Sequence, residues 1–415
     1  MKNEIVTNID APEKLERLYR RDKFQFEDWL VEAIKMFPDS ETLRVWHARV
    51  NYTPSPSGKR ENKGLISIFI LSLLSFTLLK LPYIFNIPDE WFYGRFSAII
   101  IISSLIIYFL ITKNHSQNKK IIIICCMFFS TAYMWLLPNV KSSQSIVMSQ
   151  IHMPLFFLFI LSISFIDSDW KNIKDWLTFI RYLGEMVIYV IIILIGGIVL
   201  TFITIELFDL IGISIEKWYI EYIVILGLVS APIVATYLYD IVLRQKSNIS
   251  NIIANTFSPL FLITVICYLI AMFYAKKSPY SDRDFLITFN GLLIAVWAIT
   301  VFSISGIGNF KKNKLILIIN ISLIVTTLII NGVALSAILF RVFEYGISPN
   351  KVVVSGVNIL IFTHLIVILI AYSKYIKTES GITKIMTKSI LSFLPVYIIW
   401  SLFVITILPF IFNFK

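Results

Sequence analysis

The sequence predicts an all-α fold: a polytopic membrane helix bundle of about eleven transmembrane helices with a small helical head at its N-terminus. Of the 415 residues, 57% are hydrophobic and 15% are charged, whereas an ordinary soluble domain has about 25% charged residues. Apolar runs of about eighteen or more residues recur along the chain, and about twenty such residues in a helix cross a bilayer. Strands of a membrane β-barrel are short and alternate in polarity, so these long runs favour helices.

Residues 1–57 are polar and are predicted to form a cytosolic three-helix head that ends in the hinge TPSPSGK. The first helix begins with a capping box, in which Asp10 is the N-cap and Glu13 lies at N3. Apolar residues recur at helical spacing in the second helix: Phe26, Trp29, Leu30, Ala33 and Phe37. About fifty residues are marginal for an independent fold. The head is therefore expected either to pack on the membrane domain or to bind a cytosolic protein partner.

Residues 58–415 are predicted to form the transmembrane helical domain. Its eleven candidate spans cover residues 64–82, 96–113, 120–138, 145–166, 183–208, 220–243, 253–275, 285–305, 314–340, 352–373 and 389–411. Lys and Arg near span ends are enriched on the cytoplasmic side of a membrane. With the head inside, the inner loops hold eighteen Lys and Arg and the outer loops nine. This bias predicts a cytoplasmic N-terminus and an extracytoplasmic C-terminus.

Charged residues gather on the predicted outer side, above all in the stretch RVFEYGISPN between the ninth and tenth spans. In this stretch Gly346 permits positive φ, Pro349 fixes φ, and Asn350 completes the structural motif. The candidate ligand-binding residues on this side are Arg341, Glu344, Arg283, Asp284, Glu206 and His152. Charges at membrane depth usually have partners. Two interpretations stay open: the charges pair and lock loops, or they line a site for a small solute or ion.

Other polar residues lie inside the predicted spans: Lys80, Glu185, Asp240, Asn290, Asn320, Asn331, Asn358 and His364. Long side chains near span ends, such as Lys80, reach the headgroup layer. Membrane asparagines form hydrogen bonds between helices more often than they bind substrates. The asparagines are therefore expected mainly to hold helices together.

The sequence contains none of the common catalytic or phosphate-binding motifs, such as the Walker, HExxH, CxxC and GxSxG patterns. The three cysteines lie in apolar runs, and the histidines form no ligand constellation, so no cofactor, no metal and no catalytic residue are predicted. The net charge of +11 is attributed to loop lysines rather than to nucleic-acid binding. The first residues contain no apolar segment typical of a cleavable signal peptide.

Several segments, among them FSPLFLITVICYLIAMFY, KSPYSDRDFLITFNGLLI, NGVALSAILFRVFEYGISPNKV and LPVYIIW, resemble a bacterial integral membrane family, domain of unknown function 4153. Its mark is the pattern R-x-x-E-x-G-x-[ST]-P-N-[RK] between two late spans. The matching residues are Arg341, Glu344, Gly346, Ser348, Pro349, Asn350 and Lys351. The head resembles the N-terminal region of Bacteroidetes members. The resemblance implies a multi-pass protein of the bacterial cytoplasmic (inner) membrane, and it implies no activity, ligand or catalytic residue.

These observations predict a permease- or channel-like protein with a polar site on the extracytoplasmic side. The alternative is a non-transporting scaffold or signalling protein whose cytosolic head binds a partner. A third hypothesis is a membrane-embedded enzyme that acts on lipid or envelope precursors, with a site assembled from His152, Glu206 and Arg341. The lipid bilayer is the one partner that the composition itself requires.

Overall fold

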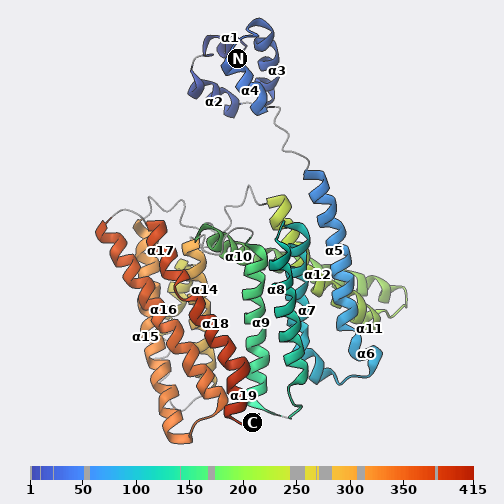
Figure 1. Ribbon diagram of the computed structural model, residues 1–415, viewed down its shortest axis with the longest axis vertical. Coiled ribbons are helices and arrows are strands. Elements are labelled where there is room, and N and C mark those ends of the chain that lie inside the picture. The colour runs from blue at the N-terminus through green and yellow to red at the C-terminus, as the bar shows by residue number, and fades with distance from the viewer. Residues whose placement is uncertain are drawn as a thin grey trace. The chain divides into compact units, whose positions relative to one another are not determined.

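The computed structural model describes residues 2–9, 11–21, 23–50, 57–140, 142–166, 173–243, 258–267, 269–270, 283–305, 314–378 and 382–415. These residues contain helices and their connections and no strand, which confirms the all-α class (Figure 1). The chain divides into two compact units, Met1–Asn62 and Lys63–Lys415. Each unit is described below by itself.

The first unit contains helices α1 (Lys2–Thr7), α2 (Pro12–Arg21), α3 (Lys23–Met36) and α4 (Glu41–Val50). Its core is apolar and includes Ile5, Leu15, Phe26, Leu30, Leu43 and Trp46. Ser40 begins α4 as its N-cap, because its Oγ accepts a hydrogen bond from the Leu43 N–H at 3.4 Å. Phe37 is 44% exposed, so its predicted core position is wrong: α3 ends one residue before it. Asp10 lies outside the described residues.

The second unit is a bundle of long helices with short connecting elements (Figure 1). Its elements are α5 (Ser57–Leu79), α6 (Leu81–Phe85), α7 (Asp89–Thr112), α8 (Gln117–Leu136), α9 (Gln144–Phe165), α10 (Ile173–Leu210), α11 (Glu216–Trp218), η1 (Tyr219–Val224), α12 (Ile225–Tyr237), η2 (Leu238–Leu243), α14 (Arg283–Ser305), α15 (Lys314–Tyr345), α16 (Pro349–Thr378), α17 (Ile382–Leu391), α18 (Leu394–Leu402), η4 (Phe403–Ile407) and α19 (Leu408–Ile411). The three η elements are π-helical.

Eight helical segments within the described ranges are long and apolar enough to cross a membrane. They are Asp89–Thr112, Gln117–Leu136, Gln144–Phe165, Asp175–Leu210, Glu216–Asp240, Leu317–Tyr345, Pro349–Ile376 and Ile385–Ile411. Three shorter apolar helices, Gly64–Leu79, Ser258–Cys267 and Asn290–Ile304, fall within the remaining predicted spans. The multi-pass membrane architecture is therefore supported, while the number of about eleven spans stays a prediction.

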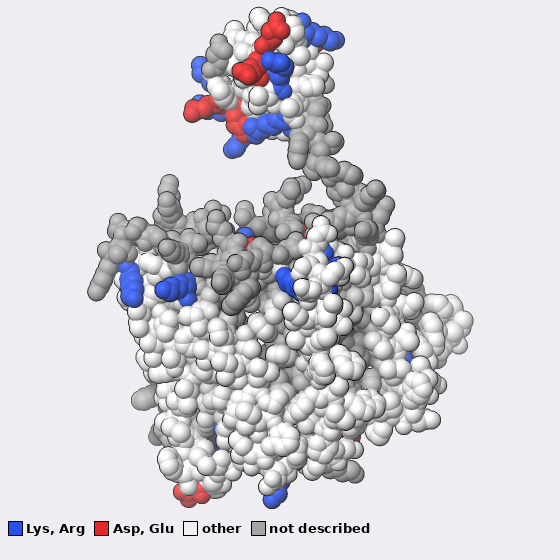
Figure 2. Space-filling view, in the orientation of Figure 1, with Lys and Arg blue, Asp and Glu red and all other residues white. Residues whose placement is uncertain are grey.

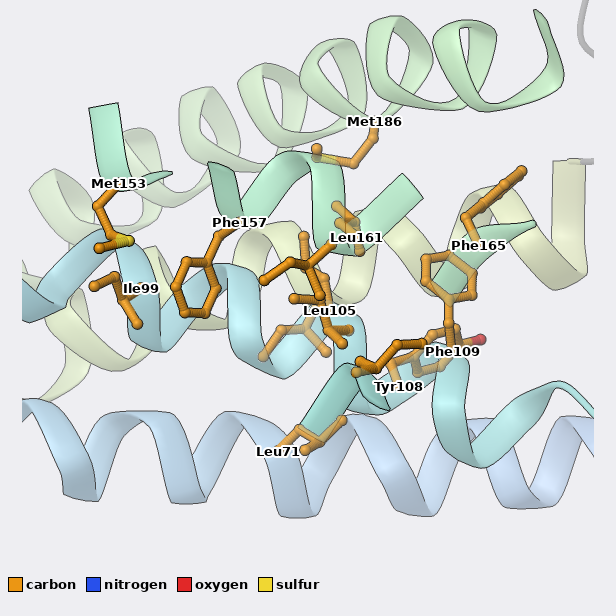
Figure 3. Close-up of a cluster of buried hydrophobic side chains, with 14 of the residues drawn as sticks. Leu71, Ile99, Leu105, Tyr108, Phe109, Met153, Phe157, Leu161, Phe165 and Met186 are labelled. Atoms are coloured by element: carbon orange, nitrogen blue, oxygen red, sulfur yellow. The ribbon is translucent and has the colours of Figure 1, made fainter. Parts of the chain in front are cut away.

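Two sets of helices build the interior of the bundle. In the first set, side chains from α5, α7, α9 and α10 interlock, and Leu105 and Leu161 lie between Phe157 and Phe165 (Figure 3). The second set consists of α14, α15, α16 and α17, packed around Leu365, Ile368 and Met386. The outer surface is also apolar, and on the face in Figure 2 the charged residues of this unit show mainly toward its two ends. Such a surface suits contact with lipid rather than water.

Several helix ends meet at one end of the bundle. The Ser145 N–H near the start of α9 donates to the carbonyl of Lys415 at 2.9 Å. Val353 near the start of α16 belongs to the same cluster as Leu408 in α19 and Met148 in α9. We call this the C-terminal end of the bundle. The alternation of predicted spans requires these three helix ends to share one side of the membrane, and the packing agrees with it.

Basic side chains cap the C-terminal ends of two neighbouring helices. The buried guanidinium of Arg95, on α7, donates three hydrogen bonds to carbonyls at the end of α8: Met134 at 2.7 Å, Leu137 at 2.9 Å and Pro138 at 3.0 Å. The last carbonyls of α9 accept from three side chains: Lys113 to Phe165, His115 to Ser164 at 2.8 Å and Lys119 to Ile166. These carbonyls have no partner within their own helix, so the basic side chains satisfy them, and the charges of the lysines and Arg95 complement the helix dipoles.

Candidate functional site

The stretch singled out in the sequence forms the turn between α15 and α16. α15 ends at Tyr345, and Gly346 follows with φ +74°, the left-handed conformation that commonly terminates a helix. Pro349 is the first residue of α16, where its missing N–H costs nothing. Ser348 precedes it, and its Oγ accepts from the Lys351 N–H at 3.4 Å. The prediction that Gly346 supplies positive φ is confirmed.

Lys351 joins the two helices of this turn. Its Nζ donates to the carbonyls of Arg341 at 3.0 Å and Gly346 at 2.7 Å, and it lies 5.6 Å from the centroid of the Tyr345 ring. A cation at the C-terminus of α15 is favoured by the helix dipole. The pattern from Arg341 to Lys351 therefore has a structural explanation: it ends one helix, starts the next and caps the first.

The remaining candidate residues lie at different places in the bundle. Glu344 is exposed at the end of α15 and Glu206 is exposed on α10. His152 is buried on α9, where its Nδ1 donates to the Met148 carbonyl at 2.9 Å. In the part of the chain that the structure describes, no hydrogen bond or ion pair joins His152 or Glu206 to the turn. Arg283 and Asp284 begin α14, and their side chains lie outside the described part. The binding role of the six residues stays a prediction.

A group of buried polar side chains that the binding prediction did not include lies between α14, α15 and α16. The Asn358 Nδ2 donates to the Asn290 Oδ1 at 2.9 Å and to the Val354 carbonyl at 2.7 Å. The Asn331 Nδ2 donates to the Asn358 carbonyl at 3.1 Å. Asn331 and Asn358 are buried. The expectation that membrane asparagines connect helices is confirmed here.

Further along α14 and α16, His364 lies at the centre of an aromatic group. The Trp297 indole N–H donates to its Nδ1 at 3.0 Å, and the Tyr397 hydroxyl lies 2.9 Å from the same nitrogen. Phe393 stacks on the imidazole with ring centroids 4.4 Å apart. An indole N–H can only donate, so Nδ1 accepts and the proton of the neutral imidazole lies on Nε2.

A third polar group follows on the same helices. The Asn320 Nδ2, on α15, donates to the Ser303 Oγ on α14 at 3.3 Å, and the Tyr372 side chain on α16 lies beside Asn320. We call the three groups the polar column; its members are Asn290, Asn331, Asn358, Trp297, His364, Tyr397, Ser303, Asn320 and Tyr372. From Asn290 to Ser303 the helix advances about 20 Å, roughly two-thirds of a hydrocarbon core of about 30 Å.

The first group of the column has acceptor capacity left over. Within the described part of the chain, the Oδ1 atoms of Asn331 and Asn358 are buried and accept no hydrogen bond. A buried acceptor without a partner costs about 1–3 kcal/mol, and such atoms usually accept from water or bind a cation. Amide oxygens are hard ligands of the kind that bind dehydrated cations in membrane sites. The group can therefore hold a proton donor, a water molecule or a small cation.

Sequence reasoning identified the asparagines and His364 as intramembrane polar residues but missed the aromatic partners. Trp297 is seven residues after Asn290, which places both on one helix face, so this spacing was a usable signal. Tyr397 was not recognisable in this way, because it comes from a different helix. Two buried carboxylates, Glu185 on α10 and Asp240 in η2, lie in the other set of helices, near Tyr189 and Tyr182 respectively.

Comparison with models of known families, with curated proteins and with solved structures finds no match for this chain. The family resemblance therefore stays a prediction from the segments quoted above.

Proposed function

We propose that this chain is a permease- or channel-like membrane protein whose polar column conducts protons or small monovalent cations. The observation that supports this proposal is the alignment of three polar groups along about 20 Å of α14 and α16, with His364 in the middle group. Ionisable groups inside membrane spans commonly mark ion pathways and proton relays. Histidine suits a relay because one ring nitrogen of the neutral imidazole donates a proton while the other accepts one.

The test is ion flux in vesicles that contain the purified full-length chain. An internal pH dye reports proton entry under an imposed potential, and separate runs replace the proton gradient by sodium or potassium. Wild-type vesicles are expected to conduct, and His364→Gln is expected to reduce the flux to that of protein-free vesicles. His47→Gln is the matched control, since it makes the same substitution at an exposed histidine of α4 in the head. Wild-type vesicles that conduct none of the three ions would refute the proposal.

We propose that the head lies in the cytoplasm of a bacterial cell and the C-terminus outside. This orientation is supported by the distribution of Lys and Arg between the inner and outer loops. Some of these residues also cap helices, so they are removed from the count. When Lys113 and Lys119 are removed from the eighteen inner residues, sixteen remain; when Arg95 and Lys351 are removed from the nine outer residues, seven remain. The bias stays above two to one, so capping does not account for it. Cysteine labelling in intact cells tests it: a cysteine beside Tyr345 should react with an impermeant reagent, and one in the hinge should not.

The alternative is a non-transporting scaffold or signalling protein whose head binds a cytosolic partner. It is favoured by the compact first unit with its own core and by the exposed apolar side chains on that unit: Val31, Met36, Phe37 and Val45. Deletion of residues 1–57 discriminates between the two functions. A shortened chain that still conducts ions would favour the permease. The scaffold would be favoured if the shortened chain inserted normally but lost a co-purifying protein, and if neither the full-length nor the shortened chain conducted ions.

A further inference from the structure

An open pocket of about 760 Å³ lies at the junction of α5, the α6–α7 connection and η1. Six of its lining residues carry polar groups: Lys80, Tyr83, Asn86, Asp89, Tyr93 and Glu221. They come from segments far apart in the sequence, and the ion pair between Lys80 and Glu221 joins α5 to η1. The pocket is separate from the polar column, which is built by α14, α15, α16 and α18.

The pocket has an excess of negative charge. The Lys80 Nζ lies 3.4 Å from the Glu221 Oε1 and 4.6 Å from the centroid of the Tyr222 ring. The Lys80 side chain is 11% exposed and that of Glu221 is 36% exposed. Asp89 is exposed and forms no ion pair within the described residues. The pocket lining therefore contains one ammonium and two carboxylates, and a second positive charge would balance them.

The pocket also lies at the ends of membrane spans. The apolar helix Gly64–Leu79 ends beside Lys80, and the spans Asp89–Thr112 and Glu216–Asp240 begin at or near Asp89 and Glu221. A tyrosine and a tryptophan are exposed around it: Tyr83 at 70% and Trp218 at 55%. Amphipathic aromatic residues of this kind concentrate at the level of the lipid headgroups. In a bilayer, a pocket at this level would be surrounded by phospholipid headgroups.

We infer that this pocket binds the phosphoethanolamine headgroup of a phospholipid. The primary ammonium of the lipid lies between the carboxylates of Asp89 and Glu221, where each accepts a charge-assisted hydrogen bond. The phosphate lies against the ammonium of Lys80 and the side-chain amide of Asn86. A choline headgroup has no N–H to donate to the carboxylates, and a glycerol headgroup has no positive charge to match them. The arrangement therefore selects ethanolamine among common headgroups.

The experiment measures which lipids stay with the full-length protein. The protein is extracted from vesicles that contain equal amounts of phosphatidylethanolamine, phosphatidylglycerol and phosphatidylcholine, and the retained lipid is quantified by mass spectrometry. Phosphatidylethanolamine is expected to be enriched. Loss of a charge-assisted hydrogen bond should weaken its binding by about tenfold or more, so Glu221→Gln and Asp89→Asn should each reduce the enrichment. The matched control is Glu90→Gln, which changes an exposed carboxylate next to Asp89.

Equal retention of the three lipids would overturn the inference, and so would full enrichment in the double variant Asp89→Asn, Glu221→Gln. Thermal unfolding of each variant shows whether it is folded. If the double variant does not fold, Lys80→Gln takes its place, with loss of enrichment expected. Soluble phosphoethanolamine should compete poorly, because it lacks acyl chains. If it displaces the lipid at equal concentration, the ligand is a free solute and the lipid assignment is wrong.

Discussion

Arg95 provides the sharpest quantitative test of the packing. Its side chain is 4% exposed and donates three hydrogen bonds to the end of α8. Hydrogen bonds between membrane helices contribute about 0.6 kcal/mol on average and up to about 1.7 kcal/mol each. Three of them give about 2–5 kcal/mol, and the contact of the guanidinium with the Trp91 ring, 5.0 Å from its centroid, adds about 0.5–1 kcal/mol. Arg95→Met should therefore destabilise the folded protein by about 2–6 kcal/mol.

The assay is reversible unfolding of the full-length chain in mixed micelles, followed by the loss of helical circular dichroism. Arg95→Lys keeps the charge but not the planar fork, so it should recover only part of the stability. Glu90→Gln, on the same helix and exposed, should leave the unfolding free energy within about 0.5 kcal/mol of wild type. If Arg95→Met also stays within that range, the three carbonyls do not depend on Arg95, and the capping argument is wrong.

Three further predictions concern close packing, the turn and the head. A Cβ at Gly356 would lie 2.0 Å from the Trp400 ring, so Gly356→Ala should destabilise the protein by about 1–3 kcal/mol in the same unfolding assay. Gly332 has open space around it, so Gly332→Ala should not destabilise the protein in this way. Equal effects of the two substitutions would contradict the packing argument. Gly346 has φ +74°, so Gly346→Ala should destabilise the folded protein by about 1–2 kcal/mol, and Gly346→Asn should destabilise it less. A Gly346→Ala variant as stable as wild type would show that the turn does not require positive φ. In the head, hydrogen bonding and charge from Arg20, and then from Arg49, lower the pKa of Glu16. Its contribution to stability is therefore complete above the unfolded-state pKa and is lost as pH falls through the lower folded-state pKa. The protection factors of amides in residues 11–50, which are corrected for the intrinsic pH dependence of exchange, should fall in acid, and Glu16→Gln should remove the part of that fall due to Glu16. Protection factors that do not change with pH would show that the ion pairs contribute nothing.

The sequence predicted what depends on composition and local geometry. Eight of the apolar runs appear as helices of membrane-spanning length, because hydrophobicity over about twenty residues is a property of a single segment. Gly346 and Pro349 were interpreted correctly because each has a strong backbone preference of its own. In the head, the helical spacing identified Leu30 and Ala33 as buried residues, and it failed at Phe37, one residue beyond a helix end.

What the sequence did not predict depends on which helix faces meet. Lys351 was counted as a loop cation, yet its Nζ donates to the carbonyl of Arg341, ten residues earlier in the sequence, and so caps α15. Trp297 is 67 residues from His364 in the sequence, and Tyr397 is 33 residues away. Single-sequence periodicity gives the polar face of a helix but not its neighbour. The pocket beside Lys80 was missed for the same reason, since Glu221 lies 141 residues away.

Close approach of helices explains how the polar column forms. Gly356 leaves room for the Trp400 ring of α18, and Tyr397, three residues before Trp400, reaches His364 on α16. At Gly184, on α10, the Phe302 ring of α14 occupies the space that a Cβ would take, so α14 lies close to α10. Phe302 directly precedes Ser303 of the polar column. Small residues thus set the distances between backbones, as in many membrane proteins. They also allow bulky polar side chains to meet inside the bundle, where each hydrogen bond then depends on the position of the neighbouring helix.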